Sequence, residues 1–568
     1  MIPKVDHLTA KTKKSQGAHY TPPELAQFVA KQVIEAWLSV RAEHGGGISP
    51  FTILDPAVGG GELLEAIHSE LPNEHRSASR MVGMDNDPKA VEIARTRLSS
   101  LSQNTLITQG DFLDSLTGNE PDLFGGEESL RDVDLIIANP PYVRTQVLGA
   151  KKAQALATKF GLRGRVDLSY PFILGIVEKL RPNGVAGIIT SNRFFSTQAG
   201  ASLRESLRCG TNIIHVWDLG DTKLFEAAVL PCILLVRKAP PSGRTLFTSC
   251  YSVSPQERRP EPTKLFSHFA RGTEGVVELG KGSQYEIKCG KLEVGEDLDA
   301  VWKLRNGESS AWAEKVKRST WKTLGELTKV RVGVKTTADQ VFIRSDWENE
   351  CPSGIPETLR PLVTHHLAER FRGHRPEKKI LYTHEMVDGR KRPIQLDCYP
   401  HASEYLNRHQ TQLKARKYVE KAGREWFEIW VPQEPTAWDQ PKIVFKDIAV
   451  KPTFWLETEG SVVNGDCYWF TFGNALTDLY WLSLGVFNST FIERFYDAHF
   501  ANKLYSGRRR FMTQYVSEFP LPDPDSRHAN KIVKIARELY DCPERENELI
   551  EDLDSAVAVA FGLSVKEI

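Results

Sequence analysis

The chain has few cysteines, and they lack the spacing of a metal-binding or disulfide-rich protein. Its 568 residues contain 8 cysteines, and no two of them form a CxxC pair. Structural zinc sites usually draw on closely spaced cysteine or histidine pairs, so we expect no metal ion. A chain of this length can bury a full core without disulfides, and we therefore expect reduced thiols.

The sequence also lacks long hydrophobic runs, a secretion signal and an excess of one charge. No apolar stretch approaches the ~18 residues that a membrane-spanning helix requires. The opening residues, MIPKVDHLTAKTKK, have no apolar core of the kind found in signal peptides. Lys plus Arg and Asp plus Glu both number 73, which argues against histone-like binding but leaves room for a local basic cleft. We therefore expect a cytoplasmic protein with no membrane contact.

The first 240 residues do contain a clear alternation of strand-like and helix-like segments. Short apolar runs predict strands, and amphipathic or capped segments between them predict helices. The expected strands are 51–54, 81–84, 106–107, 133–138, 185–190, 213–217 and 230–236. The expected helices are 25–38, 61–69, 88–98 and 167–180. Such alternation is typical of an α/β domain with a mostly parallel sheet and helices on both faces.

Changes in this pattern predict four regions. Residues 1–240 form the α/β domain, and residues 241–320, which begin with a stretch rich in Pro, Ser and Arg, connect it to the next region. Residues 321–525 lose the strand–helix alternation, which predicts a second domain of α+β type. Residues 526–568 predict a tail of two helices.

The expected strand at 133–138 runs directly into Asn139-Pro140-Pro141-Tyr142. Ligands of open α/β sheets bind at the carboxyl ends of the strands. A side-chain amide, a rigid backbone and a flat ring at that edge suit one task, which is to hold a planar amine and present its nitrogen to an electrophile.

Three neighbouring strand ends carry groups suited to an adenosine ligand. A turn containing Gly59 and Gly61 follows the first strand, and glycines there let a ligand approach the backbone closely. Asp85 ends the second strand, where a ribose diol is bound in such folds. Asp111 and Phe112 follow the third strand, where a carboxylate can accept from an adenine amine beside an aromatic ring.

Taken in order, these motifs resemble those of gamma-class DNA adenine-N6 methyltransferases, which depend on S-adenosylmethionine. The resemblance covers residues 17 to about 237 and implies a Rossmann-like methyltransferase domain followed by a DNA-recognition domain and a helical tail. It also implies a restriction-modification or phage-defence setting. The motifs that carry it are His19-Tyr20-Thr21-Pro22-Pro23-Glu24, Asp55-Pro56-Ala57-Val58-Gly59-Gly60-Gly61, Asp85, Asp111-Phe112 and Asn139-Pro140-Pro141-Tyr142.

The resemblance assigns roles to individual residues. Asn139 and Pro140 would accept hydrogen bonds from the amine of a flipped adenine, while Tyr142 and Phe225 would stack on its ring. The residues expected to bind the cofactor are Tyr20, Thr21, Asp55, Pro56, Gly59, Gly61, Asp85, Asn86, Asp111 and Phe112.

The carboxyl-terminal half is expected to bind DNA, because an enzyme of this kind needs a surface that reads base edges. The strongest candidates are Arg508, Arg509 and Arg510, although an ordinary solvated charge run fits them about equally well. Lys151 and Lys152, in the polar segment after the motif, are further candidates as phosphate contacts or as part of a solvated loop. We expect double-stranded DNA as the partner, a separate restriction endonuclease or defence-system subunit, and a monomeric enzyme.

Other functions remain open at this point. Methyltransferases for RNA base amines or for protein glutamine amides share the same four-residue motif and the same kind of planar target. A nicotinamide-dependent oxidoreductase is disfavoured, because Leu64 occupies the third glycine position of a GxGxxG turn. A catalytically silent DNA-binding subunit is disfavoured by the intact Asn139.

Overall fold

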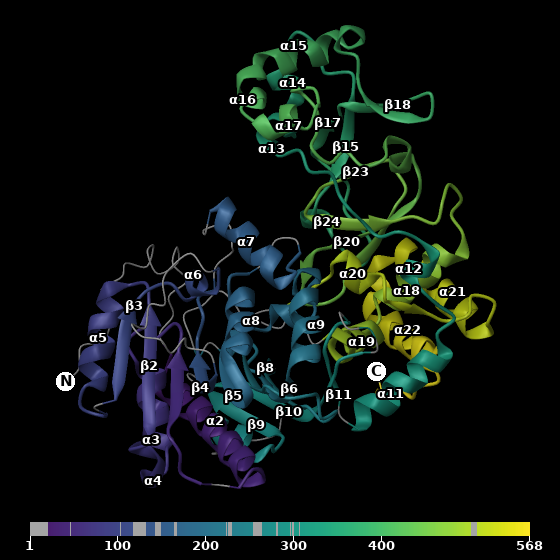
Figure 1. Cartoon of the computed structure of the whole chain (residues 1–568). Helices are drawn as coiled ribbons and strands as arrows, with labels where there is room; N and C mark the ends of the chain where they lie inside the picture. Colours follow the sequence, from purple (N-terminus) through teal and green to yellow (C-terminus); the bar gives the residue numbers. More distant parts are fainter. Residues whose placement is uncertain are drawn as a thin grey trace. The chain divides into compact units, whose positions relative to one another are not determined.

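The computed structural model describes residues 21–567 except 46, 103, 118–131, 143–148, 164–166, 223, 225–229, 254–263, 280–281, 296, 298–299, 306 and 501–507. The chain divides into two compact units (Figure 1). Unit 1 comprises residues 1–307 and 500–507, and unit 2 comprises residues 308–499 and 508–568.

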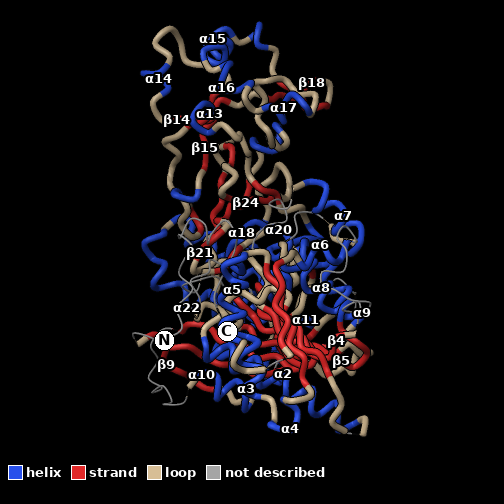
Figure 2. The backbone as a smooth tube through the Cα atoms, turned by 60° about the vertical axis from the view of Figure 1, so that its left-hand side comes forward, coloured by secondary structure: helices blue, strands red, loops and turns tan. Residues whose placement is uncertain are grey.

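Unit 1 is built on one large sheet, which Figure 2 shows as a continuous group of strands. Its order is β11-β10-β8-β6-β7-β5-β4-β1-β2-β3, and β9 pairs with β10. The strands β1 to β5 pair in parallel, while β7 lies antiparallel between β5 and β6. The strand bounds are β1 Phe51–Asp55, β2 Ser79–Asp85, β3 Thr105–Gln109, β4 Val133–Ala138, β5 Leu180–Ser191, β6 Asn212–Asp218, β7 Pro231–Arg237, β8 Leu246–Val253, β9 Gly275–Leu279, β10 Ser283–Glu293 and β11 Lys303–Arg305.

Helices cover both faces of this sheet. One face carries α2, α3 and α5, and the other carries α6, α7, α8 and α9. The helix bounds are α2 Pro23–Glu43, α3 Glu62–Glu70, α4 Asn73–Arg76, α5 Pro88–Leu98, α6 Phe112–Thr117, α7 Ala150–Phe160, α8 Ser169–Lys179, α9 Ala201–Gly210 and α10 Leu265–Arg271, with short 3₁₀ turns η2 Asn192–Phe195 and η3 Gln198–Gly200. The α/β architecture predicted from the sequence is therefore confirmed.

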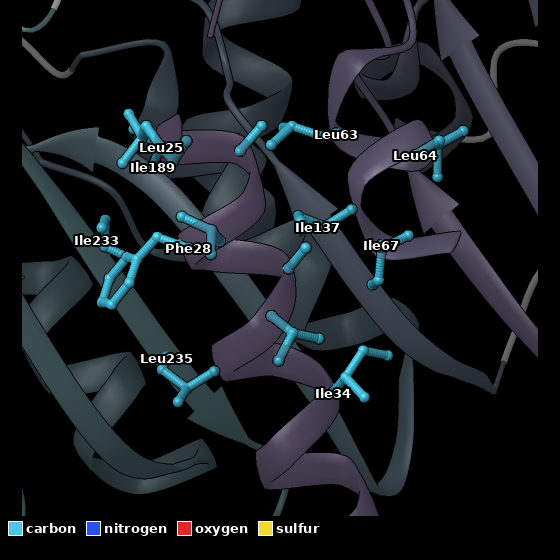
Figure 3. Close-up of a cluster of buried hydrophobic side chains, with 14 of the residues drawn as sticks. Leu25, Phe28, Ile34, Leu63, Leu64, Ile67, Ile137, Ile189, Ile233 and Leu235 are labelled. Carbon is cyan, nitrogen blue, oxygen red and sulfur yellow. The ribbon is translucent and has the colours of Figure 1, made fainter. Parts of the chain in front are cut away.

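Strand residues alternate between two cores because successive side chains point to opposite faces of a sheet. In β4, Ile137 packs under α2 and α3, whereas the preceding Ile136 packs in the opposite core. Figure 3 shows the first core, where Phe28 of α2 lies beside Ile233 of β7. Burying a side chain of this size contributes about 1.5–3 kcal/mol, so α2 is held firmly against the sheet.

The segment expected to connect the two domains also contributes strands. Residues 246–253 and 283–293 form β8 and β10, which extend the sheet of unit 1. β8 pairs in parallel with β6, and β10 pairs antiparallel with β8, β9 and β11. In β10, Tyr285 and Ile287 are buried and two positions apart, which is the alternation of a strand covered on one face. The strand was not predicted, because the Pro-rich stretch before it is typical of a linker.

Unit 2 contains several small sheets surrounded by helices. A five-stranded sheet has the order β13-β24-β20-β22-β16, and a four-stranded sheet has the order β14-β17-β15-β23. Three further strand pairs are β12-β26, β18-β19 and β21-β25. The bounds are β12 Lys322–Thr323, β13 Arg331–Val332, β14 Ile343–Arg344, β15 Leu359–Val363, β16 Phe371–Arg372, β17 Lys379–Leu381, β18 His384–Val387, β19 Arg390–Pro393, β20 Lys442–Lys446, β21 Ile448–Ala449, β22 Phe454–Glu457, β23 Val462–Val463, β24 Cys467–Phe470, β25 Arg509–Arg510 and β26 Pro520–Leu521.

The helices of unit 2 include the two that were expected in the tail, α21 and α22, which pack against each other and against α18. Their amphipathic faces explain this packing, since α21 buries Ile532, Ile535 and Leu539 on one side. The bounds are α11 Gly307–Ser319, α12 Leu324–Leu327, α13 Asp339–Phe342, α14 Trp347–Glu350, α15 Pro400–Arg408, α16 Gln410–Lys414, α17 Lys417–Lys421, α18 Asp478–Phe487, α19 Thr490–Phe500, α20 Thr513–Val516, α21 Arg527–Asp541 and α22 Glu546–Ala560, with η4 His365–Leu367, η5 Leu396–Cys398, η6 Pro435–Asp439, η8 Pro543–Arg545 and η9 Val565–Glu567.

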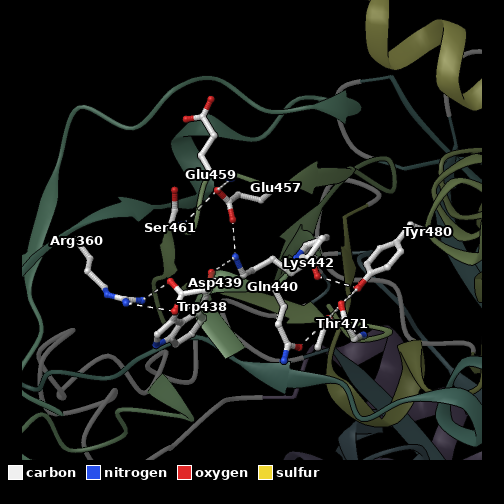
Figure 4. A network of polar contacts seen from close by, with 12 residues as sticks. Arg360, Trp438, Asp439, Gln440, Lys442, Glu457, Glu459, Ser461, Thr471 and Tyr480 are labelled. Atoms are coloured by element: carbon white, nitrogen blue, oxygen red, sulfur yellow. Dashed lines mark hydrogen bonds and ion pairs between the residues drawn. The ribbon is translucent and has the colours of Figure 1, made fainter. Parts of the chain in front are cut away.

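A buried ion pair lies inside the five-stranded sheet of unit 2 (Figure 4). The Lys442 ammonium lies 2.5 Å from the Glu457 carboxylate and also donates to the Trp438 carbonyl at 2.8 Å. The second Glu457 oxygen accepts from the backbone N–H of Glu459 and of Ser461. Burial lowers the pKa of Lys442 from its ordinary value, although the nearby carboxylate opposes this shift. Since each charge is hydrogen-bonded, losing either partner would leave a buried charge uncompensated.

Candidate functional site

The polar residues predicted from the sequence meet at one edge of the large sheet. Asp55 and Asp85 end β1 and β2, which pair in parallel, and Asn139 follows β4 on the other side of β1. Parallel strands place their carboxyl ends at the same edge, so the three side chains share a rim. The structure thus brings together two parts of the predicted site, the acids of β1 and β2 and the residues after β4.

The Asn139 side chain is oriented by a residue near the start of the chain. Its amide nitrogen donates to the Thr21 hydroxyl at 3.0 Å, although the two residues are 118 positions apart. Thr21 is 7% exposed and immediately precedes Pro22, the residue that caps α2. With the nitrogen held by Thr21, the Asn139 oxygen is directed away from Thr21, where it can accept a hydrogen bond.

The Tyr142 hydroxyl donates to that same Asn139 oxygen at 2.5 Å. Burial raises the pKa of Tyr142 well above its ordinary value, so its hydroxyl stays protonated and acts as a donor at neutral pH. Pro140, which lies between these two residues in the sequence, is buried, and its ring restricts the local backbone. The motif therefore forms a compact unit, with one oxygen acceptor and one aromatic ring at the rim.

The glycine-rich turn after β1 is fixed by Asp85. The Gly59 N–H donates to one Asp85 oxygen at 3.0 Å, and the Asp87 N–H donates to the other at 2.9 Å. Gly61 adopts a φ of 86°, a conformation that strongly favours glycine. A Cβ built on Gly59 would meet none of the described atoms within 4 Å, so there is room for a ligand above this residue.

The carboxyl groups of Asp55 and Asp85 lie where water reaches them poorly. Asp55 is fully buried, and its Oδ1 accepts from the Ala57 N–H at 3.0 Å. Its Oδ2 is buried and has no hydrogen-bond partner among the described residues. Burial raises the pKa of Asp55 well above its ordinary value, and burial also raises that of Asp85. A cationic ligand group would offset the cost of keeping these carboxylates ionised, so the residues present fit a positively charged adenosine cofactor.

Asp111 lies at the start of α6 and is paired with a lysine. Its Oδ1 accepts from the Leu113 N–H at 2.9 Å, and its Oδ2 lies 2.5 Å from the Lys152 ammonium on α7. The same ammonium lies 2.8 Å from Asp114. Lys152 therefore contacts acids of unit 1 in this structure. Its neighbour Lys151 is exposed, and the assignment of both lysines to DNA stays a prediction.

The other residues predicted to bind the cofactor have different environments. Phe112 is 3% exposed and packs on Phe172, with ring centroids 5.4 Å apart. Pro56 is buried, and Asn86 is exposed. Tyr20, and Phe225 of the predicted base-stacking pair, lie outside the described residues.

A buried polar cluster that was not predicted from the sequence lies farther along the same edge. Asp218 ends β6 and accepts from the Asn192 amide at 3.0 Å and from the Tyr251 hydroxyl at 2.6 Å. It also accepts from the Gly220 N–H, and burial raises its pKa to about 6. The only sequence signal was an acid at a strand end, the same signal that was used for Asp85. The cluster rigidifies the rim between β5, β6 and β8.

Two of the three arginines predicted to bind DNA have internal partners in unit 2. Arg509 is 8% exposed and makes a two-point contact with Asp497, both distances being 2.8 Å. Arg510 makes a similar contact with Asp447, at 3.1 Å for both bonds. Arg508 is exposed. A DNA contact by these residues stays a prediction, and the geometry favours Arg508 over its neighbours.

Within the described part of the chain, no group of three or more His, Cys, Asp and Glu side chains could hold a metal ion. Among the described residues, no helix is both long enough and apolar enough to cross a membrane.

Two protein-family models match the chain. Residues 79–225 match the Eco57I restriction-modification methylase model, and residues 388–521 match the TaqI-like C-terminal specificity domain model. The first match lies in unit 1 and contains the motif after β4, whereas all of the second match except residues 500–507 lies in unit 2.

Individual proteins are similar along almost the whole chain. Type II methyltransferase M.BanIII of Aneurinibacillus aneurinilyticus is 38% identical over 97% of this chain and 98% of its own length. Type II methyltransferase M.BstVI of Geobacillus stearothermophilus is 24% identical over 99% of this chain and 98% of its own length.

Solved structures share the fold at low sequence identity. A nuclease-deletion mutant of the Type ISP restriction-modification enzyme LlaGI, bound to a DNA substrate mimic, has a TM-score of 0.54 at 12% identity. That match covers 92% of this chain and 54% of the other. The DrdV–DNA complex has a TM-score of 0.53 at 13% identity, covering 93% and 57% respectively. With the strand order above, these matches confirm the predicted fold class, a Rossmann-like methyltransferase domain followed by a specificity domain and a helical tail.

Proposed function

Because this chain belongs to the Type II methyltransferases of restriction-modification systems, we propose that it is a site-specific adenine-N6 DNA methyltransferase. It would act on an adenine flipped out of duplex DNA, since the amine is otherwise engaged in a base pair. S-adenosylmethionine, when bound, would supply an electrophilic methyl group. The match to a specificity domain in unit 2 supports DNA as the substrate.

The observation that carries this proposal is the orientation of the Asn139 amide. Thr21 holds the amide nitrogen, which leaves the amide oxygen directed toward Tyr142 at the rim. There, Asn139 Oδ1 and the Pro140 carbonyl oxygen would accept the two hydrogens of the adenine amine. These bonds would draw the nitrogen toward tetrahedral geometry and stabilise the positive charge that develops on it.

The remaining residues bind and orient the reactants. The Tyr142 ring would stack on the flipped base and offset part of the unstacking cost, at about 1–3 kcal/mol per base. Gly59 leaves room for the cofactor, and the Asp55 and Asp85 carboxylates would face its cationic and ribose groups. No strong base is required in advance, because the amine becomes acidic only once it is methylated.

The proposal also concerns the cellular setting. We place the enzyme in the cytoplasm of its host, where the DNA that it would modify is found. A separate restriction endonuclease that cuts the same sequence is the expected partner, and the monomeric state stays a prediction.

A methylation assay with purified protein tests the proposal. Radiolabelled S-adenosylmethionine is supplied with duplex DNA, RNA or protein, and sequencing of methylated bases in a host that expresses the chain then identifies the base. Label in N6-methyladenine at one recurring sequence is the expected result. Label in cytosine would contradict adenine specificity, and label only in RNA or in a protein glutamine would favour the alternative methyltransferases.

A further inference from the structure

Unit 2 carries a two-stranded hairpin that is separate from its larger sheets. Strands β18 and β19 pair with each other, and neither pairs with another described strand. Two residues connect them, Asp388 with a φ of 50° and Gly389 with a φ of 69°. Positive φ at both positions is the type I′ turn, whose twist matches that of the flanking strands and which strongly prefers Asp-Gly. Figure 1 shows the hairpin extending away from the neighbouring strands of its own unit.

The base of the hairpin is fixed by buried polar contacts. His384, 6% exposed, lies 3.1 Å from Glu428, whose other oxygen accepts from the Glu425 N–H at 2.8 Å. The next residue, Glu385, accepts from the Tyr399 hydroxyl at 3.1 Å. The hairpin is therefore a short ribbon with a rigid base, which presents its far end in a defined direction.

The far strand presents three consecutive basic residues to solvent. Arg390, Lys391 and Arg392 are all exposed, and among the described residues none of their side chains has a hydrogen-bond or ion-pair partner. The acid opposite Arg392 is Glu385, which is engaged with Tyr399. Asp388 in the turn is the other acid of the ribbon. These cations differ from Arg509 and Arg510, whose guanidinium groups are occupied by internal carboxylates.

From these contacts we propose that the β18–β19 hairpin is a DNA-binding ribbon, in which Arg390, Lys391 and Arg392 contact phosphates of the duplex. A two-stranded ribbon fits the major groove of B-DNA, and basic side chains on it neutralise the flanking phosphates. Residues along a strand are spaced about 3.3 Å apart and alternate in direction, so the arginines lie on one face of the ribbon and the lysine on the other. The inference rests on the proposed function, because it takes duplex DNA as the ligand.

Binding of a labelled duplex that contains the methylated sequence tests the inference. Affinity is measured by fluorescence anisotropy between 50 and 200 mM NaCl for the full-length wild type and for the variant R390A/K391A/R392A. Each lost phosphate contact lowers the salt slope of binding by about 0.9, so three contacts lower it by about 2.7. Over this fourfold salt range, the ratio of variant Kd to wild-type Kd should therefore shrink by about 40-fold.

A matched control separates a local contact from a change in net charge. The variant R527A/K531A/K534A removes the same charge from exposed positions on α21. It should leave the salt slope within about one unit of wild type, which corresponds to about one phosphate contact. An equal loss of slope in both variants, or no loss in the hairpin variant, would overturn the inference.

A second variant distinguishes loss of phosphate contacts from misfolding of the alanine variant, and the wild type distinguishes failure of this inference from failure of the proposed function. R390K/R392K keeps the charges, so it should retain the wild-type salt slope while the alanine variant loses it. If the lysine variant loses slope as well, phosphate contact by charge is refuted. If the wild type neither binds nor methylates duplex DNA, the proposed function itself fails; if it does both and the hairpin variants match it, only the present inference fails.

Discussion

Substitutions of Tyr142 separate the contribution of its ring from that of its hydroxyl. The hydroxyl donates to Asn139 Oδ1, the atom that would accept from the adenine amine. The bond from Tyr142 would therefore have to give way to a bond from the adenine amine when the base enters. Tyr142→Phe removes one hydrogen bond, whose net value is about 0.5–1.5 kcal/mol, and should change kcat/KM by about tenfold at most. Tyr142→Ala removes the stacking surface, worth about 1–3 kcal/mol, and should lower kcat/KM by about 5- to 150-fold.

The assay is single-turnover transfer of a radiolabelled methyl group to a duplex containing the recognition sequence. A second duplex with 2-aminopurine at the target position reports base flipping by fluorescence, which should fall for the alanine variant and persist for the phenylalanine variant. Cofactor affinity, measured by calorimetry, should be unchanged in both variants and serves as the control. Equal losses for Tyr142→Phe and Tyr142→Ala would refute stacking and show that only the hydroxyl matters.

Four further predictions follow from contacts described above. Asn139→Ala should lower kcat by at least about 10²–10³-fold while the calorimetric Kd for the cofactor stays near wild type, and near-normal turnover would contradict the proposed role. Lys152→Met should tighten cofactor binding by about 2- to 5-fold, because Lys152 pairs with Asp111, the acid expected to bind the adenine of the cofactor. A change in the salt slope of DNA binding would instead support the prediction that Lys152 contacts DNA. Arg509→Ala should lower the free energy of unfolding by about 3–5 kcal/mol in thermal or chemical denaturation, because it breaks the pair with Asp497. Arg508→Ala should leave this free energy unchanged and reduce the salt slope of DNA binding by about 0.9. Equal stability of the two variants would count against an internal role for Arg509. Burial raises the pKa of Asp218 to about 6, so the folded state holds its proton longer than the unfolded state and loses stability as pH rises from about 4 through 6. Asp218→Asn should therefore gain about 3 kcal/mol relative to wild type over that range, and a pH-independent difference in melting temperature would refute this sign.

The polar residues at the carboxyl edge of the large sheet could be predicted because they follow strands directly. A strand that ends in a polar motif places that motif at the carboxyl edge, whatever the rest of the chain does. This reasoning brought Asp85 and Asn139 to the same edge of the sheet. It could not find the bond between Asn139 and Thr21, because a contact over 118 positions depends on how α2 docks on the sheet.

Charge runs gave poorer guidance than strand ends. Arg508, Arg509 and Arg510 look alike in the sequence, yet the last two are held by carboxylates that only the fold brings close. The hairpin residues Arg390 and Arg392 were not selected, because a short Asp-Gly turn between mixed residues does not reveal that its strands stand apart from the other sheets. Whether a basic side chain is free to bind a ligand depends on the residues that surround it in the folded protein.

The hydrogen bond between Thr21 and Asn139 means that the protein could be split into two fragments whose association restores the orientation of Asn139. Thr21 lies two residues before α2, and residues 47–50, which lead from α2 to β1, are exposed. If the gene were cut between α2 and β1, the larger fragment would keep the strand edge but lose the hydroxyl group that orients the Asn139 amide. Methylation would then return only when the short fragment bound back, driven by apolar contacts such as that of Phe28 with Trp217. In such a split enzyme, DNA methylation would report that the two fragments had associated.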